Sequence, residues 1–124
     1  MTTPSPTGTD SAPLVYEVTA RVAPAAAEAY AAWLGPHIEE ILSLDGFTGA
    51  TWHVVEAAEG EAAEGEAAGG ETDVVFCVRY GLRDRDALEA YLRDHAPRLR
   101  EDGRRRFGRA FSATRRVMAR RATW

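Results

Sequence analysis

The chain contains a repeated stretch: residues 15–22, Val-Tyr-Glu-Val-Thr-Ala-Arg-Val, recur in outline as residues 75–82, Val-Phe-Cys-Val-Arg-Tyr-Gly-Leu. The likeness continues downstream, because residues 28–30 (Glu-Ala-Tyr) return as residues 89–91, and residues 49–55 return loosely as residues 112–118. The three offsets are 60, 61 and 63 residues. An order kept at nearly constant spacing predicts two copies of one β-α-β unit.

Both copies of the repeated stretch alternate in polarity, which is typical of a strand with one buried face. In residues 14–22 and 74–82 every second residue is apolar. On the opposite face, the first strand carries polar residues apart from Val15. The second strand carries Val75 and Cys77 there. We therefore expect something to cover this second face of the sheet.

Helical spacing follows each of these two strands. Pro24 is expected to begin the first helix, and Asp45-Gly46 to end it before a strand that starts at Phe47. Its apolar residues recur at helical spacing: Ala27, Tyr30, Leu34, Ile38 and Ile41. These positions predict one buried stripe.

The second helix is expected to begin after Asp84, which is a suitable N-cap, and to be interrupted near Pro97. A further helical piece is predicted as far as Phe107, and a last strand over roughly residues 110–120. The apolar stripe of this segment comprises Leu88, Tyr91, Leu92, His95 and Leu99. The order β-α-β-β-α-β predicts the ferredoxin-like α+β fold, an antiparallel sheet with its helices on one face.

The length of 124 residues fits one domain, which we place at residues 14–121. Residues 1–13 are expected to be a disordered tail. Residues 57–71 form three Ala- and Glu-rich pentads without a basic residue and predict a flexible loop. Docking of a basic partner on this loop is an alternative.

The single cysteine, Cys77, excludes an internal disulfide, and no apolar run reaches membrane-spanning length. A cytoplasmic location and no membrane association are therefore expected. On Cys77 itself, packing at an interface is favoured over a role as nucleophile.

Several short motifs resemble those of a known family: Trp-Leu-Gly-Pro-His at 33–37, Gly-Phe at 46–47, Tyr-Leu-Arg-Asp-His-Ala-Pro at 91–97, and Phe-Ser-Ala-Thr-Arg-Arg at 111–116. They are similar to an uncharacterised bacterial family described as a domain of unknown function. Its members resemble the dimeric α+β barrel superfamily, to which antibiotic-biosynthesis-monooxygenase-like proteins belong. The resemblance covers about residues 14–118, except for the glutamate-rich loop.

This resemblance implies a ferredoxin-like fold and a homodimer in which two sheets face each other, which would also cover the second face. It brings no catalytic residue with it. More distant members resembling this topology include cofactor-independent monooxygenases, lactone isomerases and haem-degrading enzymes. Shared fold alone is weak support for shared function.

The candidate catalytic residues are His37 and His95, because each follows an aromatic residue by four positions near the end of its predicted helix. We expect a pocket between helices and sheet, bounded by Tyr30, Trp33, Tyr80 and Tyr91. There a histidine could move a proton during a cofactor-independent oxygenation or isomerisation of a small aromatic or acidic compound, with Tyr16 or Tyr80 holding an oxygen. The alternative is a non-catalytic dimeric binding module with structural histidines.

A metal site is not expected, since His37, His53 and His95 lack ligand spacing. The C-terminal end is basic: residues 98–124 hold ten arginines against Glu101 and Asp102. One interpretation is an anion site formed by Arg100, Arg104, Arg115 and Arg116, because guanidinium groups bind carboxylates and phosphates well. The favoured interpretation is a solvated surface that pairs with acidic residues elsewhere, including those of the glutamate-rich loop.

An RNA-binding module is a third interpretation, because RNA-recognition modules share this strand order and stack bases on aromatic residues of the open sheet face. Here Tyr16 and Tyr80 fall at the positions expected to face the helices. Nucleic acid is therefore the least favoured ligand. The interpretation requires that these two rings project from the open face of the sheet.

Overall fold

An antiparallel sheet forms the base of the molecule, with the strands in the order β2-β3-β1-β4. The structure is a computed structural model that describes residues 13–56 and 72–124. The strands are β1 (Leu14–Val22), β2 (Phe47–Val54), β3 (Val74–Leu82) and β4 (Phe111–Ala119). The two strands of the repeated stretch, β1 and β3, lie side by side in the centre.

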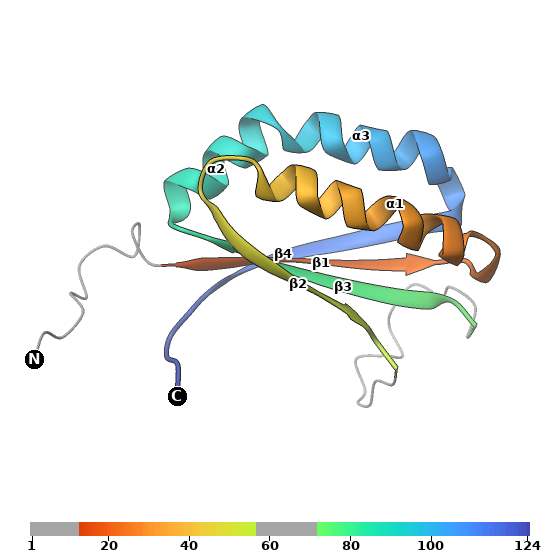
Figure 1. Ribbon diagram of the computed structural model, residues 1–124, viewed down its shortest axis with the longest axis horizontal. Coiled ribbons are helices and arrows are strands. Elements are labelled where there is room, and N and C mark those ends of the chain that lie inside the picture. The colour runs from red at the N-terminus through yellow and green to blue at the C-terminus, as the bar shows by residue number, and fades with distance from the viewer. Residues whose placement is uncertain (1–12, 57–71) are drawn as a thin grey trace, which may run out of the picture.

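The helices of the described residues cover one face of the sheet, as Figure 1 shows. They are α1 (Pro24–Leu42), α2 (Arg85–Asp94) and α3 (Ala96–Phe107), and the short 3-10 helix η3 (Gly108–Ala110) leads into β4. The ferredoxin-like α+β fold predicted from the repeat is confirmed. The second helix is divided between α2 and α3 beside Pro97, where the sequence predicts an interruption.

The core lies between the helices and the facing side of the sheet. The predicted stripe of α1 is buried at Tyr30, Leu34, Ile38 and Ile41. The alternating apolar residues of the central strands lie beneath it: Leu14, Tyr16, Ala20 and Val22 from β1, and Phe76, Val78, Tyr80 and Leu82 from β3. Burial of these two periodic patterns against each other accounts for the layered arrangement.

Local signals set the element boundaries. Helix α1 begins at Pro24, whose missing N–H costs nothing at a first helical position. The Asp84 carboxylate caps α2 by accepting a hydrogen bond from the Ala87 N–H at 2.9 Å. Gly46 precedes β2 with a φ of +92°, a conformation that favours glycine.

The other face of the sheet is more polar at its centre than the apolar residues Val15, Val75 and Cys77 suggest. The Glu17 carboxylate accepts hydrogen bonds from Arg79 Nε at 2.8 Å and from Arg116 Nε at 2.6 Å. Both arginines stand directly opposite Glu17 on the neighbouring strands, and they leave Glu17 only 4% exposed. Three charged residues therefore span the middle of the open face.

Two segments predicted to be disordered or flexible fall largely outside the described residues. These are residues 1–12 of the predicted tail and the whole loop 57–71. The last residue of the predicted tail, Pro13, is described, and its carbonyl accepts a hydrogen bond from the Arg120 N–H at 3.3 Å. Within the described ranges, no helix is both long and apolar enough to span a membrane.

Candidate functional site

A cleft of about 320 Å³ lies between α3 and β4. Its size is at the lower end of the range of small-molecule sites in proteins. One wall comes from α3 and its C-terminal end, and the other from the first half of β4. The lining residues are Pro97, Arg100, Glu101, Arg104, Gly108, Phe111, Ser112, Ala113 and Arg115.

Three arginines contribute positive charge to this cleft. Arg104 forms an ion pair with Glu101 one helical turn away on α3. Arg100 donates a hydrogen bond from Nη2 to the Tyr16 hydroxyl oxygen at 2.8 Å and forms no salt bridge in the described part of the chain. Arg115 likewise has no acidic partner among residues 13–56 and 72–124. Two of the three guanidinium groups are thus available to an anion.

Arg115 also acts electrostatically on side chains of α1 and α2. Its positive charge lowers the pKa values of Tyr30, Tyr91 and His37, although in each case burial has the larger effect. For both tyrosines burial raises the pKa, to about 12. The guanidinium of this edge-strand residue therefore lies close enough to the core to influence its chemistry.

Arg116, the fourth predicted anion-binding residue, does not line this cleft. It pairs with Glu17 on the open face of the sheet. Adjacent residues of a strand point to opposite faces, so the side chains of Arg115 and Arg116 leave β4 on opposite sides, although both residues border a hollow beside Glu17. The alternation of residues along β4 was a signal in the sequence that could have separated them.

The four predicted pocket aromatics pack against other rings. Tyr30, Tyr80 and Tyr91 are buried, with 4%, 2% and 5% exposure. The Tyr30 ring stacks on Phe76 at 5.6 Å, and Tyr91 meets Tyr16 edge-on at 5.8 Å. The rings therefore fill the region between helices and sheet, and burial raises the pKa of Tyr80 well above its usual value.

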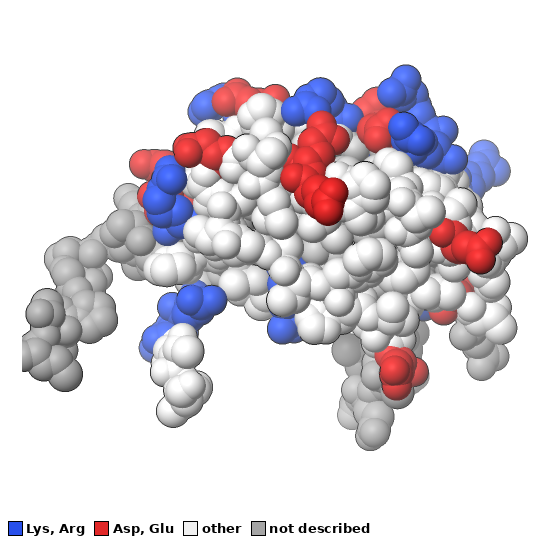
Figure 2. All heavy atoms as spheres, viewed as in Figure 1, with Lys and Arg blue, Asp and Glu red and all other residues white. Residues whose placement is uncertain are grey.

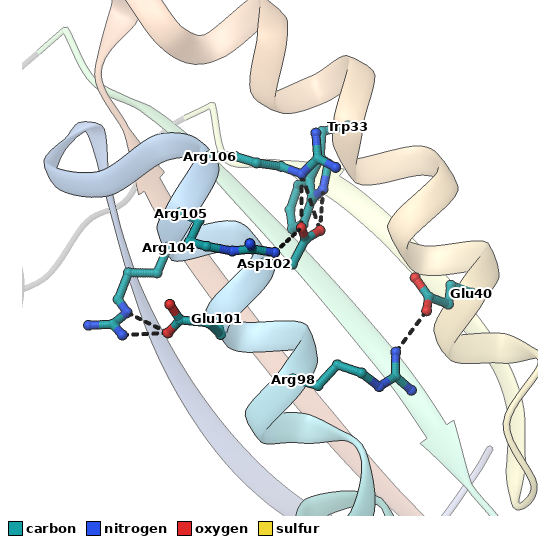
Figure 3. Close-up of polar contacts among 8 residues, drawn as sticks. All are labelled: Trp33, Glu40, Arg98, Glu101, Asp102, Arg104, Arg105 and Arg106. Atoms are coloured by element: carbon teal, nitrogen blue, oxygen red, sulfur yellow. Dashed lines mark hydrogen bonds and ion pairs between the residues drawn. The ribbon is translucent and has the colours of Figure 1, made fainter.

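Trp33 and His37 lie where α1 faces α3. Their rings stack at 4.2 Å between centroids, and the Trp33 indole N–H donates to Asp102 Oδ2 of α3 at 3.2 Å. Figure 3 shows Trp33 and Asp102 pointing toward one another, with Arg106 beside them. Burial lowers the pKa of His37, while Glu40 and Asp102 oppose this effect. His37 is therefore held in its neutral form at pH 7.

His95 occupies a different place, at the junction between α2 and α3. Its Nδ1 lies 3.0 Å from Nη2 of Arg98, and Arg98 in turn pairs with Glu40 of α1 at 3.0 Å. The Arg98–Glu40 pair links α3 to α1 (Figure 3). Among the described contacts none joins His95 to His37. The two predicted catalytic residues are therefore not in direct contact, and Glu40 is the residue that links them, because it acts on the pKa of His37 and pairs with Arg98 beside His95.

Sequence reasoning missed two features of the site. One is the bond between Arg100 and Tyr16, which are 84 residues apart. The other is the indole bond between Trp33 and Asp102, 69 residues apart. Nothing in local spacing indicates either pair, because each depends on how α3 packs on the rest of the fold.

In the two described ranges, no group of three His, Cys, Asp or Glu side chains is arranged to hold a metal ion. The Tyr16 and Tyr80 rings lie on the helix-facing side and are almost fully buried, so they offer no stacking surface on the open face.

The family described as Domain of unknown function (DUF4286) matches residues 13–121, and the chain belongs to this family. By sequence, no curated protein matches the chain.

Solved structures share the fold at low sequence identity. SnoaB, a cofactor-independent oxygenase from Streptomyces nogalater, is 15% identical, with a TM-score of 0.54 over 90% of this chain and 96% of its own. Rv0793 from Mycobacterium tuberculosis is 20% identical, with a TM-score of 0.55 over 90% and 97%. A candidate antibiotic biosynthesis monooxygenase from Bacillus cereus is 12% identical, with a TM-score of 0.58 over 91% and 97%. At these identities the likeness shows the fold alone.

Proposed function

We propose that this protein binds a small organic anion in the cleft between α3 and β4. The observation that carries the proposal is that Arg100 and Arg115 line this cleft without an acidic partner in the described part of the chain. Guanidinium groups that face a concave site and are not neutralised favour an anionic ligand. Pro97, Phe111 and Ala113 supply apolar surface for the rest of the molecule.

The alternative of a solvated surface is weaker for Arg100 and Arg115 than for the remaining arginines of α3. Charged side chains of both signs gather over the helical layer (Figure 2). Arg98, Arg104, Arg105 and Arg106 all have acidic partners there, as a solvated surface would provide. Arg100 and Arg115 depart from this pattern, and both line the cleft.

The proposal predicts that Arg115→Gln weakens binding of an aromatic anion. Benzoate and inorganic phosphate serve as probes, titrated into the protein while amide chemical shifts are recorded. We expect Arg115→Gln to reduce the affinity for the bound anion by about tenfold, the order expected for one charge-assisted hydrogen bond. Arg109→Gln is the matched control, because Arg109 is an exposed arginine of η3 that does not line the cleft. Equal affinities for both variants, or no binding to the wild type, would refute the proposed site.

A second proposal is that His37 acts as a base in a cofactor-independent oxygenation of a phenolic aromatic acid. It is favoured by the position of His37, which is half-buried and stacked on Trp33, where burial lowers its pKa so that the neutral imidazole can accept a proton. Removal of the phenolic proton gives an electron-rich phenolate that can reduce dioxygen. One oxygen atom then enters the ring as a carbonyl, the other leaves as water, and the substrate supplies the electrons.

Oxygen uptake with 1-hydroxy-2-naphthoate tests this second proposal. This probe carries a phenol and a carboxylate, and insertion at the carbon opposite the hydroxyl would yield a naphthoquinone carboxylate and water. Turnover should disappear in His37→Gln and persist in His53→Gln, because His53 is an exposed histidine of β2. If no uptake occurs although the anion binds, the non-catalytic binding module is the better interpretation.

We also propose that the protein is a homodimer joined through the open faces of the two sheets, in the cytoplasm. Half-buried Val15, Val75 and Cys77 on that face support a covering partner. A symmetric pairing would bury the same patch twice. The single thiol, Cys77, forms no internal disulfide and suits a reducing compartment.

A further inference from the structure

We infer that the Tyr16 hydroxyl, held by Arg100, is a recognition group of the α3–β4 cleft and that the ligand is a small aromatic carboxylic acid. This inference rests on the proposed anion site and names its substrate class. Tyr16 lies on the helix-facing side of β1, is 3% exposed and is not itself among the lining residues; its hydroxyl reaches the cleft through Arg100, which is. Its ring is fixed by Tyr91, which it meets edge-on, and by Tyr80 at 6.3 Å.

The hydroxyl of Tyr16 has an unused hydrogen-bonding capacity. Its oxygen accepts from Arg100 Nη2 at 2.8 Å, and it donates to no residue of the described ranges. A phenol can accept one hydrogen bond and donate another at the same time. The proton of Tyr16 is therefore available to an acceptor that also contacts Arg100.

Strand register brings Arg115 toward the same point. Tyr16 stands directly opposite Val117 of β4, and Arg115 is two residues away from Val117 on the same face. Such diagonal neighbours in an antiparallel pair are about 7–8 Å apart, within reach of a long side chain. The Arg100–Tyr16 pair and Arg115 can thus hold the two oxygens of one carboxylate.

Two features favour a carboxylate over a phosphate. Phosphate sites commonly use the free N–H groups at the start of a helix, but Pro97 in the first turn of α3 has no N–H to donate. The cleft also contains Glu101, which adds a negative charge beside the three arginines and disfavours a dianion. Phe111 and Pro97 provide apolar surface for a flat ring.

Benzoate titrations of Tyr16→Phe test the inference. This variant keeps the buried ring and removes the hydroxyl alone. We expect its affinity for benzoate to fall by about tenfold or more, as for a hydrogen bond to a charged group. Tyr80→Phe is the matched control, since it removes a hydroxyl from the same core on the neighbouring strand and leaves Arg100 in place. Its affinity should stay within about twofold of the wild type, within the scatter between similar sites.

Titrations with other probes show which part of the proposal is wrong if an expected result does not appear. Benzamide, the neutral analogue, should bind much more weakly than benzoate, and inorganic phosphate should bind more weakly than benzoate. If Arg115→Gln loses benzoate but Tyr16→Phe retains it, the role of Tyr16 is overturned while the anion site stands. Tighter binding of phosphate than of benzoate overturns the carboxylate class alone. If the wild type binds no probe, both the proposed site and this inference are wrong.

Discussion

At the scale of single residues, charge placement separates structural groups from groups available to a ligand. Glu17 is almost fully buried and accepts from Arg79 and Arg116, so all three charges are used within the sheet. Arg100 and Arg115 instead face a cleft without acidic partners in the described ranges. The first group stabilises strand register, and the second is the basis of the proposed site.

Stability should depend on the ionisation of Glu17. The hydrogen bond from Arg116, aided by Arg79, lowers the pKa of Glu17 despite its burial. The ionised group therefore contributes stability above the pKa of an unfolded glutamate, about 4.3, and this contribution is lost as the pH falls through the lower folded-state pKa. Glu17→Gln should reduce the free energy of unfolding by about 2 kcal/mol at pH 7, because two guanidinium groups lose their partner.

Urea unfolding at pH 7 and at pH 3 measures both effects. The difference between wild type and Glu17→Gln should shrink at the lower pH. Glu89→Gln is the control, because Glu89 is exposed on α2 and forms no salt bridge in the described part of the chain. A pH-independent difference would contradict the stabilising role of the ionised carboxylate.

At the scale of the elements, close contacts set where helices and strands begin. Gly46 stands between α1 and β2 with a positive φ, and a Cβ added there would lie 2.3 Å from the Ala87 Cβ of α2. The turn therefore needs glycine for its backbone conformation and for the approach of α2. Gly35, in the middle of α1, has no atom within 4 Å of an added Cβ.

These two glycines should respond in opposite directions to alanine. Gly46→Ala should lower the free energy of unfolding by on the order of 3 kcal/mol, the sum of backbone strain and overpacking. Gly35→Ala should raise it by about 1 kcal/mol, since alanine favours the helix and meets no neighbour. Thermal and urea unfolding of the two variants provide the measurement. A stabilising Gly46→Ala would show that the turn does not require a left-handed residue.

At the scale of the whole molecule, the proposed dimer depends on the open face of the sheet. It combines apolar Val15, Val75 and Cys77 with the Glu17 charge cluster, so a covering partner must accommodate both. Two copies related by a twofold axis would place these groups against one another. The edge strands and the helical layer would stay outside such a pairing.

Val75→Glu should therefore dissociate the proposed dimer without unfolding it. Val75 of β3 stands directly opposite Arg21 of β1, so the new carboxylate lies beside a cation of its own chain. Native mass spectrometry should show dimers for the wild type and monomers for Val75→Glu. Val117→Glu should remain dimeric, because Val117 is an exposed residue on the other side of the sheet. A monomeric wild type would refute the face-to-face dimer.

The sequence alone determined the layered fold, because its periodic patterns record which side of each element is buried. The repeat predicted the strands, Pro24 and Asp84 marked helix starts, and Pro97 marked the division between α2 and α3. Of the aromatics predicted to line a pocket, Tyr30, Tyr80 and Tyr91 are buried in the core and Trp33 is half-buried. Periodicity identifies a buried stripe but does not distinguish a filled core from a cavity.

Only the tertiary structure decided which charges meet. Arg100 reaches Tyr16, Trp33 reaches Asp102, and Arg115 is directed to the cleft while Arg116 pairs on the opposite face. The three hydrogen bonds among these contacts join residues 69 to 99 positions apart. Their partners depend on how helices and strands pack, which local sequence patterns do not record.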